Sequence, residues 1–275
     1  MPHLLEVEGL TTVFDSDYGR TVSVDHVNFH VDKGEVVCIV GESGCGKSVT
    51  SLSIMGLLGR GGTVTEGSVV FEDKNLLTMT EKELDKIRGD RLTMIFQDPL
   101  TSLDPVFTVG NQLMESIRKH MRLSKEEARK RAEQILGKVG MPDPHSVMKK
   151  YPHTLSGGMR QRAALIRTMA LEPDILLLDE PFSALDYQTR LTVSADIAAM
   201  IRKAEKSVIL ITHDLAEAIS LADRVLILSA RPARVKAEFP IHLTAADHSP
   251  LAARRAPEYG QLFNQIWEEL SNENN

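Results

Sequence analysis

The chain has 275 residues, of which 42% are hydrophobic and 25% are charged. These proportions are typical of a soluble globular protein and exclude collagen-like, disordered and disulfide-scaffold chains. The formal net charge of -6 argues against a protein that coats nucleic acid nonspecifically, because such binding depends on neutralising many phosphates.

The N-terminus and the apolar runs carry no sign of export or of a membrane span. Residues 1–6 lack the basic start and the apolar stretch of a signal peptide, so we expect a cytoplasmic chain. No apolar run approaches the roughly 20 residues that cross a bilayer. Cys38 and Cys45 are too few for a disulfide framework, and we expect two reduced thiols.

Short β-rich segments alternate with helical patterns along the chain, which predicts an α/β fold. Several of these segments are apolar at every position, as in parallel strands that helices cover on both faces. We therefore predict a central, mostly parallel sheet. The expected strands are residues 4–8, 35–40, 68–72, 92–96, 175–179, 207–212 and 224–228.

The strand expected at 35–40 runs directly into a segment that matches G-x-x-x-x-G-K-[ST], a phosphate-binding loop, and a helical pattern follows it. Glycines let backbone N–H groups curl around phosphates, and the helix N-terminus adds partial positive charge. Lys47 would bring a full charge to the β- and γ-phosphates, and Ser48 would offer its hydroxyl to Mg²⁺. The alternative is a glycine-rich turn that binds nothing, which the flanking strand and helix disfavour. The residues expected to bind ATP here are Gly41, Glu42, Ser43, Gly44, Cys45, Gly46, Lys47, Ser48 and Val49.

Between residues 78 and 171 the sequence becomes charged and helix-periodic, which predicts a mainly helical insertion. One helix is well marked, because Ser124 can cap it and Glu127 can complete a capping box. Its apolar residues share one face before Gly140, and packing is the whole role that we expect of them. They are Ala128, Ala132, Ile135, Leu136 and Val139.

Two acidic residues follow the apolar strand at 175–179, at the sheet edge where ligands of open α/β folds collect. We expect Asp179 to orient Mg²⁺ through its water shell, and Glu180 to align and polarise the water that attacks the γ-phosphorus. By itself a strand ending in Asp-Glu is more often a solvated cap. Together with the phosphate loop, the pair predicts phosphoryl transfer.

A histidine follows the next apolar strand and should reach the same edge. We expect His213 to contact the γ-phosphate and tie the attacking water to the loop. Asp214 can cap the following helix, with Glu217 three residues on. The alternative is a histidine beside a helix start with no catalytic part.

The last predicted element is a helix over residues 256–270 on the surface of the core. Its larger apolar side chains recur at helical spacing. They are Tyr259, Leu262, Phe263, Ile266 and Trp267.

A phosphate loop and an acidic strand also occur in kinases, GTPases and helicases, so a further motif is needed. Residues 155–161, Leu-Ser-Gly-Gly-Met-Arg-Gln, resemble the signature of ATP-binding cassette (ABC) ATPases, and the resemblance covers about residues 4–230. A serine and two glycines opening a helix form a second anion cradle. In the family this cradle closes over ATP held by a second subunit, which implies a head-to-tail dimer. The signature residues carried over are Leu155, Ser156, Gly157, Gly158 and Gln161.

The resemblance assigns further roles, residue by residue. Gln97 is similar to the glutamine that binds Mg²⁺ and senses the attacking water. Phe14 stands where an aromatic ring stacks on adenine, with Tyr18 less favoured and an ordinary core aromatic as the alternative. The loop that links the two sites across the dimer is Ser183, Ala184, Leu185 and Asp186.

The resemblance also implies the architecture. It predicts an α/β P-loop NTPase with a mostly parallel sheet, an N-terminal antiparallel β-subdomain and a helical lobe at about residues 98–170. One ATP-binding domain would span residues 1–230, and a short C-terminal extension would span residues 231–275. ATP and Mg²⁺ are the cofactors implied.

A cassette ATPase without its own membrane span must act with partners. The resemblance implies two integral-membrane permease subunits, an identical or sister ATPase, an extracytoplasmic solute-binding protein acting indirectly, and no nucleic acid. It places the chain at the cytoplasmic face of the membrane. A soluble ABC ATPase acting on ribosomes or DNA is less favoured, because the chain has one cassette and none of the insertions of those relatives.

Two sets of residues indicate two different kinds of importer. Residues 41–58 and 95–105 resemble ATPases of dipeptide and oligopeptide importers, whereas residues 180–186, 222–225 and 228–234 resemble those of nitrate, sulfonate and taurine importers. Peptide-importer ATPases usually carry a longer C-terminal extension than this chain. We expect peptides first, because the permease-facing lobe is the peptide-like part, and keep the anions as the alternative.

Overall fold

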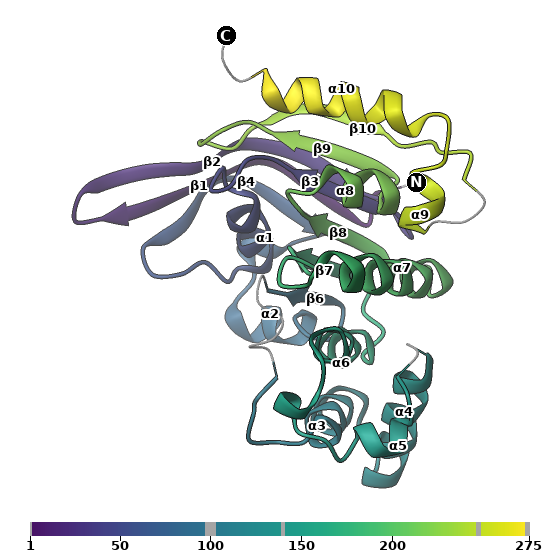
Figure 1. Cartoon of the computed structure of the whole chain (residues 1–275). Helices are drawn as coiled ribbons and strands as arrows, with labels where there is room; N and C mark the ends of the chain where they lie inside the picture. The colour runs from purple at the N-terminus through teal and green to yellow at the C-terminus, as the bar shows by residue number, and fades with distance from the viewer. Residues whose placement is uncertain (1, 97–102, 139–140, 246–248, 273–275) are drawn as a thin grey trace.

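The computed structural model describes residues 2–96, 103–138, 141–245 and 249–272, and confirms the α/β organisation (Figure 1). The strands are β1 (Leu5–Ser16), β2 (Gly19–Val31), β3 (Val36–Val40), β4 (Gly62–Phe71), β5 (Lys74–Asn75), β6 (Leu92–Ile95), β7 (Ile175–Asp179), β8 (Ser207–Ile211), β9 (Arg224–Leu228) and β10 (Val235–Pro240). The helices are α1 (Lys47–Met55), α2 (Glu81–Ile87), α3 (Val109–Met121), α4 (Lys125–Lys138), α5 (Pro144–Val147), α6 (Gly157–Met169), α7 (Tyr187–Lys203), α8 (Leu215–Leu221), α9 (Pro250–Ala253) and α10 (Tyr259–Ser271).

The main sheet has the order β10-β9-β3-β8-β7-β6, and its neighbouring strands pair in parallel except for β10, which is antiparallel to β9. Alternate residues of each central strand enter different cores. In β3, Val36, Cys38 and Val40 pack with α7 and α8, whereas Val37 and Ile39 pack with α1 and the N-terminal strands. Burial on both faces explains why the strand is apolar throughout.

The N-terminal strands form the expected antiparallel sheet, in the order β2-β1-β4-β5. The hairpin of β1 and β2 projects beyond the rest of the molecule (Figure 1) and carries Tyr18 in its exposed turn. The strand expected at residues 4–8 is only the start of β1, and β2 was not predicted. Polar and exposed positions interrupt β2, so it lacks the continuous apolar run that marked the central strands.

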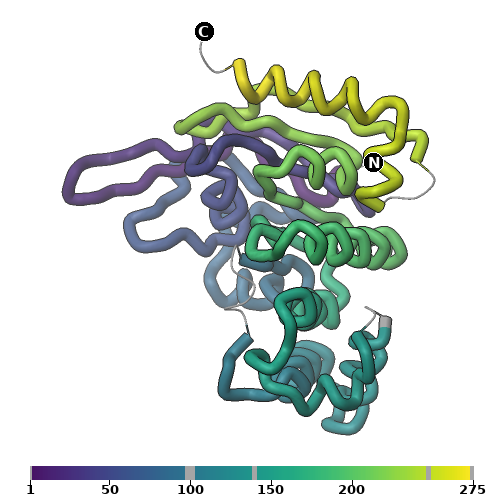
Figure 2. Tube along the Cα trace, in the orientation of Figure 1, coloured from purple at the N-terminus to yellow at the C-terminus, as the bar shows by residue number. Residues whose placement is uncertain are grey.

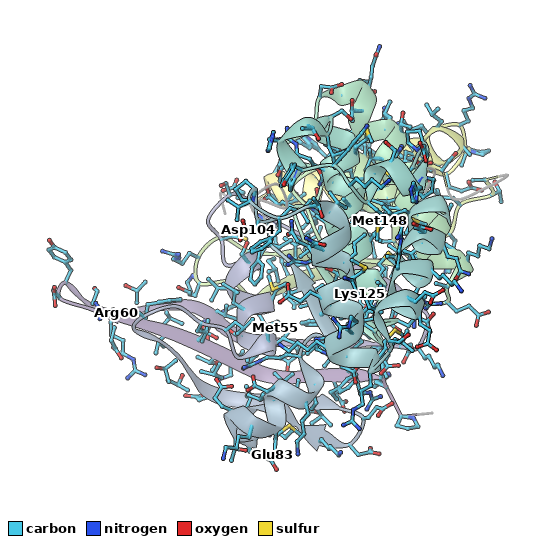
Figure 3. The ribbon with its side chains drawn as sticks, turned by 90° about the horizontal axis from the view of Figure 1, so that it is seen from below. Met55, Arg60, Glu83, Asp104, Lys125 and Met148 are labelled. Atoms are coloured by element: carbon cyan, nitrogen blue, oxygen red, sulfur yellow. The ribbon has the colours of Figure 1, made fainter. Side chains whose placement is uncertain are left out.

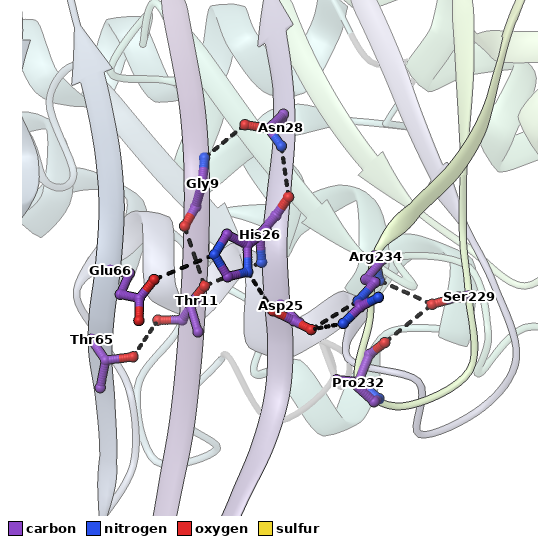
Figure 4. Close-up of polar contacts among 10 residues, drawn as sticks. All are labelled: Gly9, Thr11, Asp25, His26, Asn28, Thr65, Glu66, Ser229, Pro232 and Arg234. Carbon is purple, nitrogen blue, oxygen red and sulfur yellow. Dashed lines mark hydrogen bonds and ion pairs between the residues drawn. The ribbon is translucent and has the colours of Figure 1, made fainter.

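A polar cluster joins this sheet to the loop after β9 (Figure 4). Arg234 donates from Nε to Asp25 on β2 at 2.8 Å, and the other Asp25 oxygen lies 2.5 Å from His26 Nδ1. His26 Nε2 lies 3.3 Å from Glu66 on β4. The backbone N–H of Asp25 also donates to the carbonyl of Ala233. These contacts hold the 229–234 loop against β2.

Helices α3 to α6 form the helical lobe, which has its own hydrophobic core and lies beyond β6 of the main sheet (Figure 1). The predicted capping box is present, because Ser124 N donates to Glu127 Oε2 at 2.9 Å and Glu127 N donates to Ser124 Oγ at 3.3 Å. Val139 and Gly140 lie outside the described residues. The buried positions of the predicted apolar face are Ala128, Ala132, Ile135 and Leu136.

The segment after β9 returns to the core at the end of the molecule opposite the helical lobe (Figure 2). Strand β10, which was not predicted because its positions are partly exposed, completes the edge of the main sheet. Helix α10 corresponds to the helix expected at 256–270 and packs on α8 and β9, with Ile266 fully buried and Trp267 exposed. The boundary at residue 230 stays a prediction, although β10 belongs to the core sheet.

Over the four described ranges, no helix combines the length and the apolarity that crossing a membrane requires. Cys38 and Cys45 are both buried and are not joined in a disulfide, as expected.

Candidate active site

The loop between β3 and α1 has the backbone geometry that its glycines predict. Gly44 and Gly46 have φ of 79° and 128°, values that glycine adopts readily and other residues rarely do. A Cβ on Gly46 would lie 2.7 Å from the carbonyl oxygen of Ser23 and 2.9 Å from Cβ of Ala233. Strand β2 and the 229–234 loop therefore pack directly against the turn that leads into α1.

Lys47 is the first residue of α1, and only 5% of its surface is exposed. Its Nζ donates to the carbonyl oxygens of Gly41 and Glu42, both at 2.7 Å. The amine therefore lies inside the curve of the loop. An ammonium group and a helix N-terminus converge there, which is an arrangement suited to binding phosphate.

Ser48 and Asp179 meet at the end of the parallel strands. The hydroxyl of Ser48 donates to Asp179 Oδ1 at 3.0 Å. Asp179 ends β7 and is 4% exposed, and burial is the main cause that raises its carboxyl pKa, against the opposing hydrogen bond from Ser48. A hydroxyl and a buried carboxylate are oxygen ligands that suit Mg²⁺, and a bound cation would relieve the burial cost of the negative charge.

Glu180 and His213 come together beside this pair. The Glu180 carboxylate lies 3.3 Å from His213 Nδ1. Glu180 N donates to the carbonyl of Ile211 at 2.8 Å, and its φ of 45° is in the left-handed region, where a residue with a Cβ is strained. The fold thus holds the Glu180 side chain where β7 and β8 both end.

The residues of the signature border a second hollow. Ser156 caps α6 by accepting from Met159 N at 3.3 Å, and Asp186 caps α7 by accepting from Thr189 N at 3.0 Å. Both caps line a cavity of about 490 Å³ between α6 and α7. The other described residues lining it are Gly157, Gly158, Met159, Arg162, Ala184, Leu185, Gln188, Thr189, Thr192 and Val193, with none from the phosphate loop.

The remaining sequence-predicted residues have different outcomes. Phe14 lies half-buried on β1, and its ring packs near the Cα of Gly62. Tyr18 is fully exposed. Gln97 lies outside the described residues. Gln161 is fully buried in α6, and Ser183 donates from its hydroxyl to the carbonyl of Glu180 at 3.0 Å. The adenine, Mg²⁺ and signature roles stay predictions.

The capping prediction after His213 is partly wrong. Asp214 does cap α8, accepting from the N–H groups of Ala216 and Glu217. The Glu217 carboxylate, however, accepts from the hydroxyl of Thr212 at 2.8 Å instead of completing a capping box. Its burial raises the pKa to about 7. The buried Thr212 hydroxyl donates to Glu217 in place of the backbone N–H of Asp214, which donates to Thr212 instead.

Arg190 is a residue that sequence reasoning missed. It lies on α7 and makes ion pairs with both Asp214 and Glu217. No motif indicates this contact, because it forms between residues of α7 and residues at the start of α8. The only available signal was a basic residue shortly after Asp186.

Comparisons with known proteins identify the family of this chain. A family model described as ABC transporter matches residues 24–183. The oligopeptide transport ATP-binding protein AppD of Bacillus subtilis (strain 168) is 46% identical over 229 residues, which are 83% of this chain and 70% of the relative. The dipeptide transport ATP-binding protein DppD of the same organism is 46% identical over 231 residues, covering 84% of this chain and 69% of the relative.

A solved structure extends the likeness to three dimensions. The dimeric ATP-binding cassette MJ0796, bound to ADP and Pi in a post-hydrolysis state, superposes with a TM-score of 0.75 at 28% identity. The match covers 86% of this chain and 99% of that one. The chain therefore belongs to the ABC transporter family and is one of its ATPases.

Proposed function

We propose that this chain hydrolyses ATP to drive solute uptake through separate permease subunits, and that peptides are the solute. The observation that carries the catalytic part is the convergence of Lys47, the Ser48–Asp179 pair and the Glu180–His213 pair. They surround the place where a γ-phosphate would be bound. Relatives named as peptide transport ATP-binding proteins support the choice of solute.

The phosphates would bind at the loop between β3 and α1. Lys47 would turn its amine from the carbonyls of Gly41 and Glu42 to the β- and γ-phosphate oxygens. Ser48, Asp179 and Gln97 would hold Mg²⁺, which neutralises charge on those oxygens. The buried Asp179 carboxylate, with its raised pKa, supports a cation at this position.

Glu180 would orient the attacking water. In the reaction the water oxygen forms a bond to the γ-phosphorus, and the bond from that phosphorus to the β–γ bridging oxygen breaks, which leaves ADP and phosphate. Glu180 accepts a hydrogen bond from the water, and His213 fixes the Glu180 carboxylate while reaching the γ-phosphate. Positioning supplies most of the catalysis in this chemistry.

The signature would complete the site of a second subunit. Two features support a head-to-tail dimer: Ser156 opens α6 beside a hollow, and that hollow shares none of its described lining with the phosphate loop of the same chain. The dimeric form of MJ0796 is a further support. Phe14 would stack on adenine, and the 183–186 loop would link the two sites.

The helical lobe would dock on the permeases at the cytoplasmic face of the membrane. It exposes apolar side chains that a monomer has no reason to display together, with Val106 69% and Phe107 52% exposed. A groove of about 560 Å³ lies on the same lobe, and its lining includes Lys125 and Met148 (Figure 3). An extracytoplasmic binding protein would deliver the solute to the permeases.

An uptake assay tests the proposal. A strain lacking this chain should lose uptake of labelled di- and oligopeptides, and the wild-type chain should restore it, whereas Glu180→Gln should not. Loss of nitrate or taurine uptake instead would favour the alternative, an anion importer, because residues 180–186 and 228–234 resemble the ATPases of such importers. Unchanged uptake of both would contradict the transport role.

A further inference from the structure

We propose that Arg190 is a positioning residue for ATP hydrolysis, coupling the 183–186 loop to His213. This inference rests on the proposed roles of Glu180, His213 and the loop. Arg190 itself contacts none of the reacting atoms in the structure. It acts through the segments that it bridges.

Arg190 lies beside one carbonyl group and two carboxylates from two separate parts of the chain. Its Nη2 donates to the carbonyl oxygen of Leu185 at 3.2 Å, inside the loop. Its Nη1 lies 3.5 Å from Oδ2 of Asp214, the residue just before α8. Its Nε lies 3.9 Å from Oε1 of Glu217, in the first turn of α8. The side chain is 25% exposed and that of Glu217 only 10%, so water screens the contact incompletely.

The α8 side of the bridge leads directly to His213. Glu217 accepts from the Thr212 hydroxyl at 2.8 Å, and the same hydroxyl accepts from Asp214 N at 3.0 Å. Thr212 and Asp214, on the two sides of His213, therefore belong to a network whose carboxylates form ion pairs with Arg190. His213 in turn lies 3.3 Å from Glu180.

The loop side of the bridge leads back to Glu180. Ser183 donates from N and from Oγ to the Glu180 carbonyl, at 3.2 and 3.0 Å, and Leu185 N donates to the carbonyl of Phe182 at 3.1 Å. Arg190 then holds Leu185 from the helix that follows. Glu180 is thus connected to Arg190 along two routes, through the loop and through His213, and these routes close a ring.

An arginine suits this position better than a lysine. Its planar guanidinium holds its N–H groups in fixed directions, so it donates to the Leu185 carbonyl while its charge faces the carboxylates of Asp214 and Glu217. A lysine ammonium keeps the charge but has a single donor nitrogen. Removing the charge altogether would leave the buried Glu217 carboxylate without its cation.

The C-terminal segment adds charged and polar groups around the bridge. Arg254, next to α9, donates to the phenol oxygen of Tyr187 at 2.7 Å, and Tyr187 is the first residue of α7. Arg254 and Tyr259 also interact electrostatically with Asp214. The groups that interact with Glu217 are Arg190, Asp214, His213, Thr212 and the buried Cys38.

The test compares Arg190→Gln and Arg190→Lys with a matched control, Arg202→Gln. Arg202 also lies on α7 and also bonds a carboxylate and a carbonyl, those of Asp223 and Leu221, but at the far end of the helix. Purified chains are assayed for kcat, for KM of Mg-ATP and for thermal unfolding. Arg190→Gln should lower kcat roughly 10- to 100-fold and leave KM within about twofold, because misplaced groups affect the transition state more than binding.

A second set of measurements separates positioning from structural support. Arg190→Lys should recover part of kcat, and Arg190→Gln with Glu217→Gln should lose no more than Arg190→Gln alone, because both act on one bridge. Arg202→Gln should keep kcat. The inference is overturned if Arg190→Gln keeps the parental kcat, or if Arg190→Gln and Arg202→Gln both lose kcat in proportion to a lowered melting temperature. The proposed function fails separately, if Glu180→Gln hydrolyses at the parental rate.

Discussion

Ser48 donates a hydrogen bond to Asp179 over 3.0 Å, although 131 residues separate the two in the chain. The contact exists because β3 and β7 run parallel with β8 between them, so the residues after β3 and at the end of β7 meet at one edge of the sheet. The two residues proposed to hold Mg²⁺ are thereby placed side by side.

Lys47→Ala should weaken ATP binding roughly 10- to 100-fold, because it removes a charge-assisted hydrogen bond to phosphate from a buried position. Equilibrium binding of a fluorescent ATP analogue measures the change. Lys203→Ala, at the exposed end of α7, is the control and should bind normally. Equal affinity of Lys47→Ala and the wild type would reject the phosphate-loop assignment.

Glu180→Gln should keep ATP binding and lose turnover by about 100-fold or more, because the amide accepts a water proton far less well than a carboxylate. Phosphate release measures the rate, and the binding assay checks that the site is intact. Glu268→Gln, an exposed acid on α10, should hydrolyse at the parental rate. Full activity in Glu180→Gln would remove this residue from the mechanism.

Glu217 should make the chain's stability depend on pH in a specific direction. Its pKa rises from 4.5 to about 7 on folding, mainly because of burial, so the folded state holds this proton more tightly than the unfolded state. The associated stabilisation is fully present below pH 4.5 and is lost as the pH rises through about 7. Glu217→Gln keeps an acceptor for Thr212 but cannot titrate.

Denaturant unfolding across that pH range tests the assignment of Glu217. The free energy of unfolding of Glu217→Gln, relative to that of the wild type, should rise as the pH increases. Parallel curves for the two proteins would show that the folded-state pKa of Glu217 is not raised.

Val106→Asp with Phe107→Asp should weaken attachment to the permeases by tenfold or more, because a charge replaces exposed apolar contact area at two positions, and such anchors contribute more than about 1 kcal/mol each. Co-purification with the permeases from detergent-solubilised membranes measures attachment, and the ATPase rate of the isolated chain should not change. Leu251→Asp, an equally exposed apolar residue on α9, is the control. Undiminished recovery of permeases would place the docking surface elsewhere.

The sequence was most informative where both faces of an element are buried or where backbone chemistry constrains residue type. The run Val36–Val40 is apolar throughout because its side chains pack in two hydrophobic cores. Position 46 requires glycine because Ser23 and Ala233 lie too close to leave room for a Cβ. These constraints act on individual residues, so they are visible in the sequence. The parallel strands of the main sheet were therefore predicted correctly, and the loop after β3 has the backbone geometry that its glycines predict.

The features that the sequence did not reveal depend on contacts between distant segments. Strands β2 and β10 are partly exposed and mix polar with apolar residues, so pairing with a neighbour defines them more than composition does. The proposed role of Arg190 depends on its contacts with two different segments, the carbonyl of Leu185 and the carboxylates of Asp214 and Glu217. No spacing rule for a single helix predicts such a bridge.

We propose that hydrolysis takes place between two copies of the cassette, with the phosphate loop of one and Ser156 of the other on the same ATP. Light scattering of purified Glu180→Gln, with and without Mg-ATP, tests it most directly, because this variant should bind ATP without cleaving it. Mg-ATP should double the mass of this variant, and Ser156→Arg should abolish the doubling. A chain that stays monomeric with Mg-ATP, while the isolated wild type hydrolyses ATP at its full rate, would contradict it.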